Sequence, residues 1–248
     1  MKTSVISMGT MASVLLIGTN LMAEEAAEEK SAWEGNVQFG YVASSGNTEN
    51  SNINGKFNIK HDDEFWLHDF NAAYYQSTES ESTTAERFKL TYQADYKINQ
   101  ENSYWFINAS YEDDRFSGFE YRATLSTGYG NRLYDANDMT LDAEIGAGMR
   151  YSEEIDTVTN TTFTENEGMI RAAAKYLWQI EEDRTLSSSA SVEEGEEVRI
   201  SNFEIAFTTL IAGGVNMKAA YEARHVSEVP EGKEKLDTIV SLNLLYNF

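Results

Sequence analysis

The chain contains 248 residues, no cysteine and a single proline, and its 41 Asp and Glu residues outnumber its 19 Lys and Arg residues. Without cysteine there is no disulfide framework and no thiolate metal site, and so acidic a chain lacks the clustered cations that neutralise nucleic-acid phosphates. Aromatic residues make up 12% of the chain, whereas disordered acidic proteins are poor in them. We therefore expect a folded protein with no nucleic-acid partner.

The first 32 residues differ in composition from the rest of the chain. Lys2 is followed by an apolar stretch over residues 11–18, and the small residue Ala23 precedes the acidic run EEAAEEK. This order of basic, apolar and small residues is typical of a secretory signal peptide, and the stretch is shorter than the roughly 20 residues of a spanning helix. We predict a cleaved signal peptide over residues 1–23 and a short acidic periplasmic lead over residues 24–32.

Alternation of apolar and polar residues begins at Trp33 and recurs to the end of the chain. Between residues 87 and 98, for example, Phe88, Leu90 and Tyr92 alternate with Lys89. Successive side chains of a strand point to opposite faces, so each such segment predicts a strand with one apolar and one polar face. Twelve segments show this pattern: 33–44, 48–60, 65–77, 84–98, 103–113, 119–134, 138–153, 166–181, 184–193, 198–211, 214–227 and 235–248.

The connections alternate between longer acidic loops, such as the one expected over residues 154–165, and short turns such as DAND and AGG. In a soluble barrel the apolar face points inward, whereas in an outer-membrane barrel it meets lipid and the lumen is polar. Twelve strands of about ten residues or more match the tilted membrane strand, and the charged polar face suits a wet or salt-bridged lumen. We predict an all-β transmembrane up-and-down antiparallel barrel over residues 33–248. Its predicted lumen-lining residues are Lys89, Glu144, Arg150, Arg171, Lys175 and Arg224.

The tryptophans support the membrane interpretation. If both ends of the barrel domain lie at the periplasmic side, all four tryptophans fall at that end of their strands and on the apolar face. Tryptophan favours the membrane–water interface, where its ring lies in lipid and its N–H group stays hydrated. The predicted membrane girdle consists of Trp33, Trp66, Trp105 and Trp178.

The chain ends on TIVSLNLLYNF, in which every second residue back from Phe248 is apolar or aromatic. A terminal strand of this kind can close the barrel by pairing with the first strand, because an open sheet edge is excluded from lipid. The ending also resembles the C-terminal signal of bacterial outer-membrane proteins, and this resemblance implies recognition by the barrel assembly machinery. Tyr246 and Phe248 are the predicted signal residues.

The opening of the first strand, WEGNVQFGYVASSGNTENSNI, carries a more specific resemblance. Its Trp33, Gly35 and Gly40, followed by the SGNT run over residues 45–48, are similar to the YdiY-like family, described as salt-induced outer-membrane proteins with a domain of unknown function. This resemblance implies the outer membrane of a Gram-negative bacterium. It implies no established activity.

Two kinds of function remain open. The favoured hypothesis is a non-enzymatic role in envelope adaptation, as a narrow pore for small ions or solutes or as a structural barrel, among outer-membrane lipids and lipopolysaccharide. The alternative is a lipid-ester hydrolase, because Ser227 and His225 share the outward face near Glu234, and a histidine can activate a serine beside it. The three histidines lack zinc-site spacing, and His61 is expected in a solvated turn, so we predict no metal and no cofactor.

Overall fold

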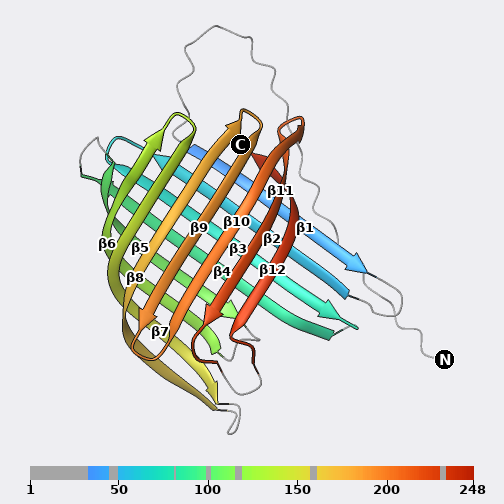
Figure 1. Cartoon of the computed structure of the whole chain (residues 1–248). Coiled ribbons are helices and arrows are strands. Elements are labelled where there is room, and N and C mark those ends of the chain that lie inside the picture. Colours follow the sequence, from blue (N-terminus) through green and yellow to red (C-terminus); the bar gives the residue numbers. More distant parts are fainter. Residues whose placement is uncertain are drawn as a thin grey trace, which may run out of the picture. The chain divides into compact units, whose positions relative to one another are not determined.

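The computed structural model describes residues 33–44, 50–80, 82–98, 102–114, 119–156, 161–229 and 233–248. The predicted signal peptide, the acidic lead and the SGNT run lie outside these ranges. Within them no helix is long and apolar enough to cross a membrane. The described chain forms twelve strands (Figure 1): β1 (Trp33–Ser44), β2 (Asn50–Asp62), β3 (Trp66–Glu79), β4 (Ser82–Lys97), β5 (Ser103–Asp114), β6 (Phe119–Ala136), β7 (Met139–Asp156), β8 (Thr161–Glu181), β9 (Arg184–Gly195), β10 (Arg199–Ala212), β11 (Val215–Val226) and β12 (Leu236–Asn247).

Each strand pairs antiparallel with its neighbours in the chain, and β12 returns to pair with β1, so the sheet closes into a barrel. The predicted all-β, twelve-stranded up-and-down architecture is therefore confirmed. Short turns join β2 to β3, β6 to β7, β8 to β9 and β10 to β11, all at the end where β12 finishes. We call this end of the barrel the turn end and the opposite end the loop end.

Local chemistry explains two of these turns. Between β2 and β3, the Asp63 carboxylate accepts the backbone N–H groups of Trp66 at 2.8 Å and Phe65 at 2.9 Å, and both bonds lower its pKa. Between β10 and β11, Gly213 and Gly214 have φ angles of 59° and 80°. A two-residue hairpin loop with two positive φ angles strongly favours glycine.

The strand bounds follow the predicted segments closely, with one substantial difference at β7 and β8. The pairing of these strands extends to Asp156↔Thr161, so most of the acidic loop expected over residues 154–165 is in fact the end of a long hairpin. The expectation was wrong because these residues lack an apolar face. Beyond the bilayer a paired strand needs no such face, and the backbone ladder and β-branched threonines suffice.

The barrel has the inside-out polarity of a membrane protein. Apolar side chains such as Phe39, Ile145 and Val240 are exposed on the outer surface, whereas polar and charged side chains are buried inside, Arg150 most completely at 1% exposure. The interior therefore has to be stabilised by hydrogen bonds and ion pairs, because unpaired charges would be costly there.

The wall formed by β6 and β7 approaches its neighbours very closely. Gly128 and Gly146 are register partners, and a Cβ atom on either glycine would overlap the backbone of the adjacent strand. The Phe106 ring also lies against Gly146 and is fully buried. Glycine is thus required here by close packing, and the space that it leaves is filled by an aromatic ring.

Candidate functional site: the barrel lumen

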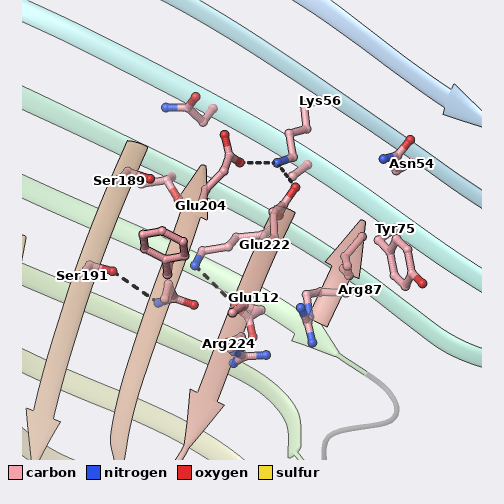
Figure 2. Close-up of a pocket in the computed structure, with 18 of the residues that line it drawn as sticks. Asn54, Lys56, Tyr75, Arg87, Glu112, Ser189, Ser191, Glu204, Glu222 and Arg224 are labelled. Atoms are coloured by element: carbon pink, nitrogen blue, oxygen red, sulfur yellow. Dashed lines mark hydrogen bonds and ion pairs between the residues drawn. The ribbon is translucent and has the colours of Figure 1, made fainter. Parts of the chain in front are cut away.

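A cavity of about 450 Å³ lies inside the barrel, between strands β1 to β5 on one side and β8 to β12 on the other (Figure 2). Among the described residues that line it, four are acidic: Glu112, Glu204, Glu222 and Asp237. Seven lining residues are basic: Lys56, Arg87, Lys89, Arg171, Lys175, Lys218 and Arg224. The cavity surface is therefore cationic, although the chain as a whole has a formal charge of −22.

Lys56 links the two sides of this cavity. Its Nζ atom donates to Glu222 Oε1 at 2.5 Å and to Glu204 Oε2 at 2.9 Å, so β2 is tied to β10 and β11 (Figure 2). Lys218 donates to the other oxygen of Glu204 at 2.8 Å. Two ammonium groups and two carboxylates thus neutralise one another at this level of the lumen.

A second set of ion pairs crosses the lumen nearer the loop end. Arg224 on β11 lies 2.5 Å from Glu112 and 3.3 Å from Asp114 on β5, and β5 is six strands from β11 in either direction around the barrel. Arg87 joins the same cluster through Asp114 at 2.6 Å and Asp237 at 3.1 Å. Opposite walls of the barrel are therefore connected, and the lumen is constricted at this level.

A third network lies on the β4–β8 side of the barrel. Glu144 accepts hydrogen bonds from Arg171 at 2.7 Å, Gln93 at 2.8 Å and the Tyr104 hydroxyl at 3.0 Å. Its carboxylate is satisfied behind Arg171 and does not line the cavity. Arg171 lines the cavity with only 9% of its side chain exposed, so its charge is largely neutralised by Glu144.

The six predicted lumen residues occupy different environments. Lys89, Arg171, Lys175 and Arg224 line the cavity. Glu144 and Arg150 point inward but lie outside the cavity lining, and Arg150 bonds Glu167 at 2.6 Å and the Val198 carbonyl at 2.7 Å. Among the described residues Lys175 alone of the six has no hydrogen bond or ion pair. Its ammonium group is exposed in the cavity and is attracted by the nearby carboxylates of Glu144 and Asp95.

The carboxylates that face these cations were not singled out from the sequence. Glu112, Glu204 and Glu222 alternate with the outward residues of their strands, so strand parity alone would have placed them inside. Which cation each one meets could not be read from parity, because Lys56 and Arg224 pair across the lumen rather than along the sheet.

The four girdle tryptophans all lie near the turn end of their strands. Trp33 and Trp105 are exposed, and Trp66 and Trp178 are half-buried. The expectation that His61 lies in a solvated turn was wrong. It belongs to β2, and its ring stacks on Trp33 at 4.3 Å between centroids, because β2 continues further toward the turn end than its apolar pattern suggests.

The predicted terminal residues lie at the closing seam between β1 and β12. Phe248 and Gly35 exchange two backbone hydrogen bonds, each of 2.9 Å, and the Phe248 ring covers Gly35 and faces Phe57 at 6.4 Å. Tyr246 is exposed on the outer face and pairs with Val37. The last residue of the chain is thus part of the barrel wall.

The predicted hydrolase residues are not connected as a catalytic unit. The Ser227 hydroxyl accepts the backbone N–H group of Arg199 at 2.9 Å, which fixes the end of β11 against β10. Within the described ranges, no hydrogen bond joins Ser227, His225 and Glu234, and both His225 and Glu234 are exposed. This arrangement does not favour nucleophilic chemistry, for which the base must lie within hydrogen-bond reach of the hydroxyl.

Comparison with known proteins places this barrel in a family. The family model described as "Protein of unknown function, DUF481" matches residues 37–248. The chain belongs to the DUF481 family. This DUF481 protein is also 29% identical over 228 residues to "Uncharacterized protein YdiY" of Escherichia coli K12, an alignment that covers 90% of this chain and 86% of that one. The resemblance to the YdiY-like family is confirmed.

Solved structures resemble this DUF481 protein in fold. The translocator domain of the autotransporter NalP from Neisseria meningitidis matches with a TM-score of 0.50 and 12% identity, over 89% of each chain. An outer membrane channel from Pseudomonas putida F1 matches with a TM-score of 0.49 and 9% identity, over 90% of this chain and 100% of that one. The likeness to the translocator domain shows the outer-membrane barrel fold and carries no information on transport.

Proposed function

We propose that this protein is a narrow, anion-preferring pore of the outer membrane of a Gram-negative bacterium. The observation that carries the proposal is the cationic lining of the lumen in a strongly acidic chain. Rings of charged side chains set the ion preference of pores. Seven basic side chains against four acidic ones line the cavity, and such an excess of positive charge favours anions there.

The ion pairs that cross the lumen make the pore narrow. Arg224 with Glu112 and Asp114, and Arg87 with Asp237, divide the interior near the loop end. Only small ions or solutes fit a path of this kind. A role in envelope adaptation of the salt-induced type is consistent with such restricted conduction and with the family membership.

The route to the membrane is part of the proposal. Residues 1–23 serve as the signal peptide, and Tyr246 and Phe248 are read by the barrel assembly machinery. The outward apolar band then meets lipid and lipopolysaccharide. Fractionation of cells should recover a mature chain beginning near residue 24 in the outer membrane, and recovery in the soluble periplasm would contradict the proposal.

Planar-bilayer recording tests the conduction. The purified barrel should carry current in KCl, and a salt gradient should give a reversal potential of the sign expected for chloride preference. Lys175→Gln should move the reversal potential toward cation preference; the replacement is neutral because Lys175 lies close enough to the Glu144 and Asp95 carboxylates to attract them, and a glutamate would repel them. Arg184→Gln, at the exposed first residue of β9, is the matched charge removal and should leave the reversal potential nearly unchanged.

The second candidate is a sealed structural barrel. It is favoured by the Arg224 cluster, which joins opposite walls. The same recordings separate the two candidates, because a sealed barrel inserts into the bilayer without producing current. Absence of current from protein shown to be folded would refute the pore.

A further inference from the structure

The seam between β1 and β12 is much shorter than the other strand interfaces. Its register runs from Asn36↔Asn247 to Phe39↔Leu244, and the Gly35–Phe248 pair extends it by one position. Every other neighbouring pair of strands shares at least ten register positions. Figure 1 shows β1 and β12 lying together near the C-terminus and diverging toward the loop end.

Both strands continue past the point where their pairing stops. Residues Gly40–Ser44 of β1 remain paired with β2, and residues Leu236–Asn243 of β12 remain paired with β11. Their other edges have no strand partner among the described residues, although the side chain of Asn243 still lies against Gly40. Val240, on the outer face of this stretch, is 81% exposed, the highest value among the exposed large hydrophobic residues.

Strand geometry identifies which backbone groups are left open. Gly35 and Phe248 form a hydrogen-bonded pair, and such pairs alternate along an antiparallel ladder. In the register of the seam, the N–H and C=O groups of Tyr41 and Leu242 therefore point into the opening. Unpaired backbone is not tolerated against lipid, but it is tolerated where it borders a polar cavity.

The cationic cavity borders this opening. Asp237 and Ile239 line it from the unpaired stretch of β12, and Gln38 of β1 lines it from the paired part of the seam. Arg87 reaches Asp237 at 3.1 Å, and Lys89 lines the same cavity. A path from the cavity to the lipid thus has cations inside and apolar side chains outside.

We infer that the β1–β12 seam is a lateral portal for an amphiphile with an anionic head group and an acyl chain. The head group lies in the cavity against Arg87 and Lys89, where it displaces Asp237 from Arg87. The acyl chain leaves along the exposed outer side chains of Tyr41 and Leu242 and enters the surrounding bilayer. Charge complementarity selects the head, and the apolar rim of the seam accommodates the chain.

Disulfide trapping tests the opening, and the absence of native cysteine makes the experiment clean. Phe39→Cys with Leu244→Cys is a paired position of the seam, and Tyr41→Cys with Leu242→Cys is the next outward-facing position in the same register. A disulfide requires Cα atoms within about 7 Å. In liposomes we expect nearly complete oxidation of the first pair and little of the second. Equal oxidation of both pairs would show a fully paired seam and overturn the portal.

Ligand binding tests the occupant. An environment-sensitive fluorophore on Ile239→Cys, in the barrel reconstituted in phosphatidylcholine liposomes, should respond saturably to dodecyl phosphate. Dodecyl maltoside and inorganic phosphate should give no saturable response. Arg87→Gln should weaken binding of dodecyl phosphate roughly tenfold, since it removes a charge-assisted hydrogen bond, whereas Arg184→Gln should not.

The outcomes separate this inference from the pore. An equal response to inorganic phosphate would show an anion site without a portal, and no response to dodecyl phosphate would remove the amphiphile; either result overturns the inference. Bilayer recordings do not depend on the disulfide or the ligand-binding experiment. A barrel with a fully paired seam can still be an anion pore, and a barrel that carries no current can still bind the amphiphile.

Discussion

The end of the chain offers a quantitative test of how this barrel is closed. Deleting Phe248 removes one position from a seam that consists of Gly35–Phe248 and the four positions between Asn36 and Phe39. Replacing Phe248 with Ala keeps the backbone and removes only the ring. The two variants therefore separate the hydrogen bonds from the side chain.

The structure gives a different magnitude for each variant. The deletion removes two backbone hydrogen bonds of 2.9 Å, each with a net value of about 0.5–1.5 kcal/mol, so the free energy of unfolding should fall by about 1–3 kcal/mol. The Ala variant should lose less than about 1 kcal/mol, because a ring already 56% exposed exchanges its remaining protein contacts for lipid contacts of similar polarity.

Denaturant unfolding in liposomes measures both values without any cellular machinery. Samples heated to increasing temperatures and run on gels should rank the two variants in the same order, by the temperature at which the band of the folded barrel disappears. In cells the ranking should change, because an aromatic terminal residue is the feature that an assembly factor would read. Both variants should then reach the outer membrane poorly. The control variant Asn247→Ser should reach it as well as the parent does. The reasoning fails if the Ala variant and the deletion lose equal stability in liposomes, or if the Ala variant assembles normally in cells.

Three further predictions concern the wall, the outer face and a turn. Gly146→Ala should lower the free energy of unfolding by about 1–3 kcal/mol through overpacking, whereas Gly168→Ala, with nothing within 4 Å of its added Cβ, should be close to neutral in the same denaturation assay. Ile145→Arg on the outer face should cost about 2–4 kcal/mol in liposomes, and Thr91→Arg in the cavity should cost less; equal costs would contradict the assigned faces. The two backbone N–H groups that donate to Asp63 lower its pKa. These hydrogen bonds to the ionised carboxylate therefore stabilise the folded state above the ordinary carboxyl pKa, and this stabilisation is lost as the pH falls through the lowered pKa. The unfolding midpoint should therefore fall more on acidification below about pH 4 in the parent than in Asp63→Asn, and parallel profiles would contradict this role.

Strand positions could be predicted from the sequence because lipid and lumen impose opposite polarities on alternate residues. The first segment, predicted over residues 33–44, matches β1 at both ends. The prediction failed at Thr161–Glu165, where β8 begins before the apolar pattern does. Polarity no longer alternates there, so the pattern that identifies a membrane strand is absent even though the backbone pairing continues.

The pairing inside the lumen could not be predicted in the same way. Parity places Arg224 and Glu112 on the inner face, but they belong to strands on opposite sides of the barrel. Their contact depends on how closely the two walls approach. That distance depends on the cross-section of the closed barrel, which no local pattern reveals.

The polar interior links the stability of this barrel to its conduction. A soluble protein can enclose a channel with an apolar core around it, but here the ion pairs of Arg224 and Lys56 both stabilise the interior and obstruct it. Removing one partner of such a pair leaves a buried charge, and this is usually strongly destabilising. A change in current in an Arg224 variant would therefore be ambiguous between a wider pore and a loosened fold. Among the described residues Lys175 is attracted by Glu144 and Asp95 without a short ion pair, so its neutralisation alters the charge of the cavity while leaving the Arg224 and Lys56 pairs intact. For this reason the Lys175 variant discriminates most sharply between an anion pore and a sealed barrel.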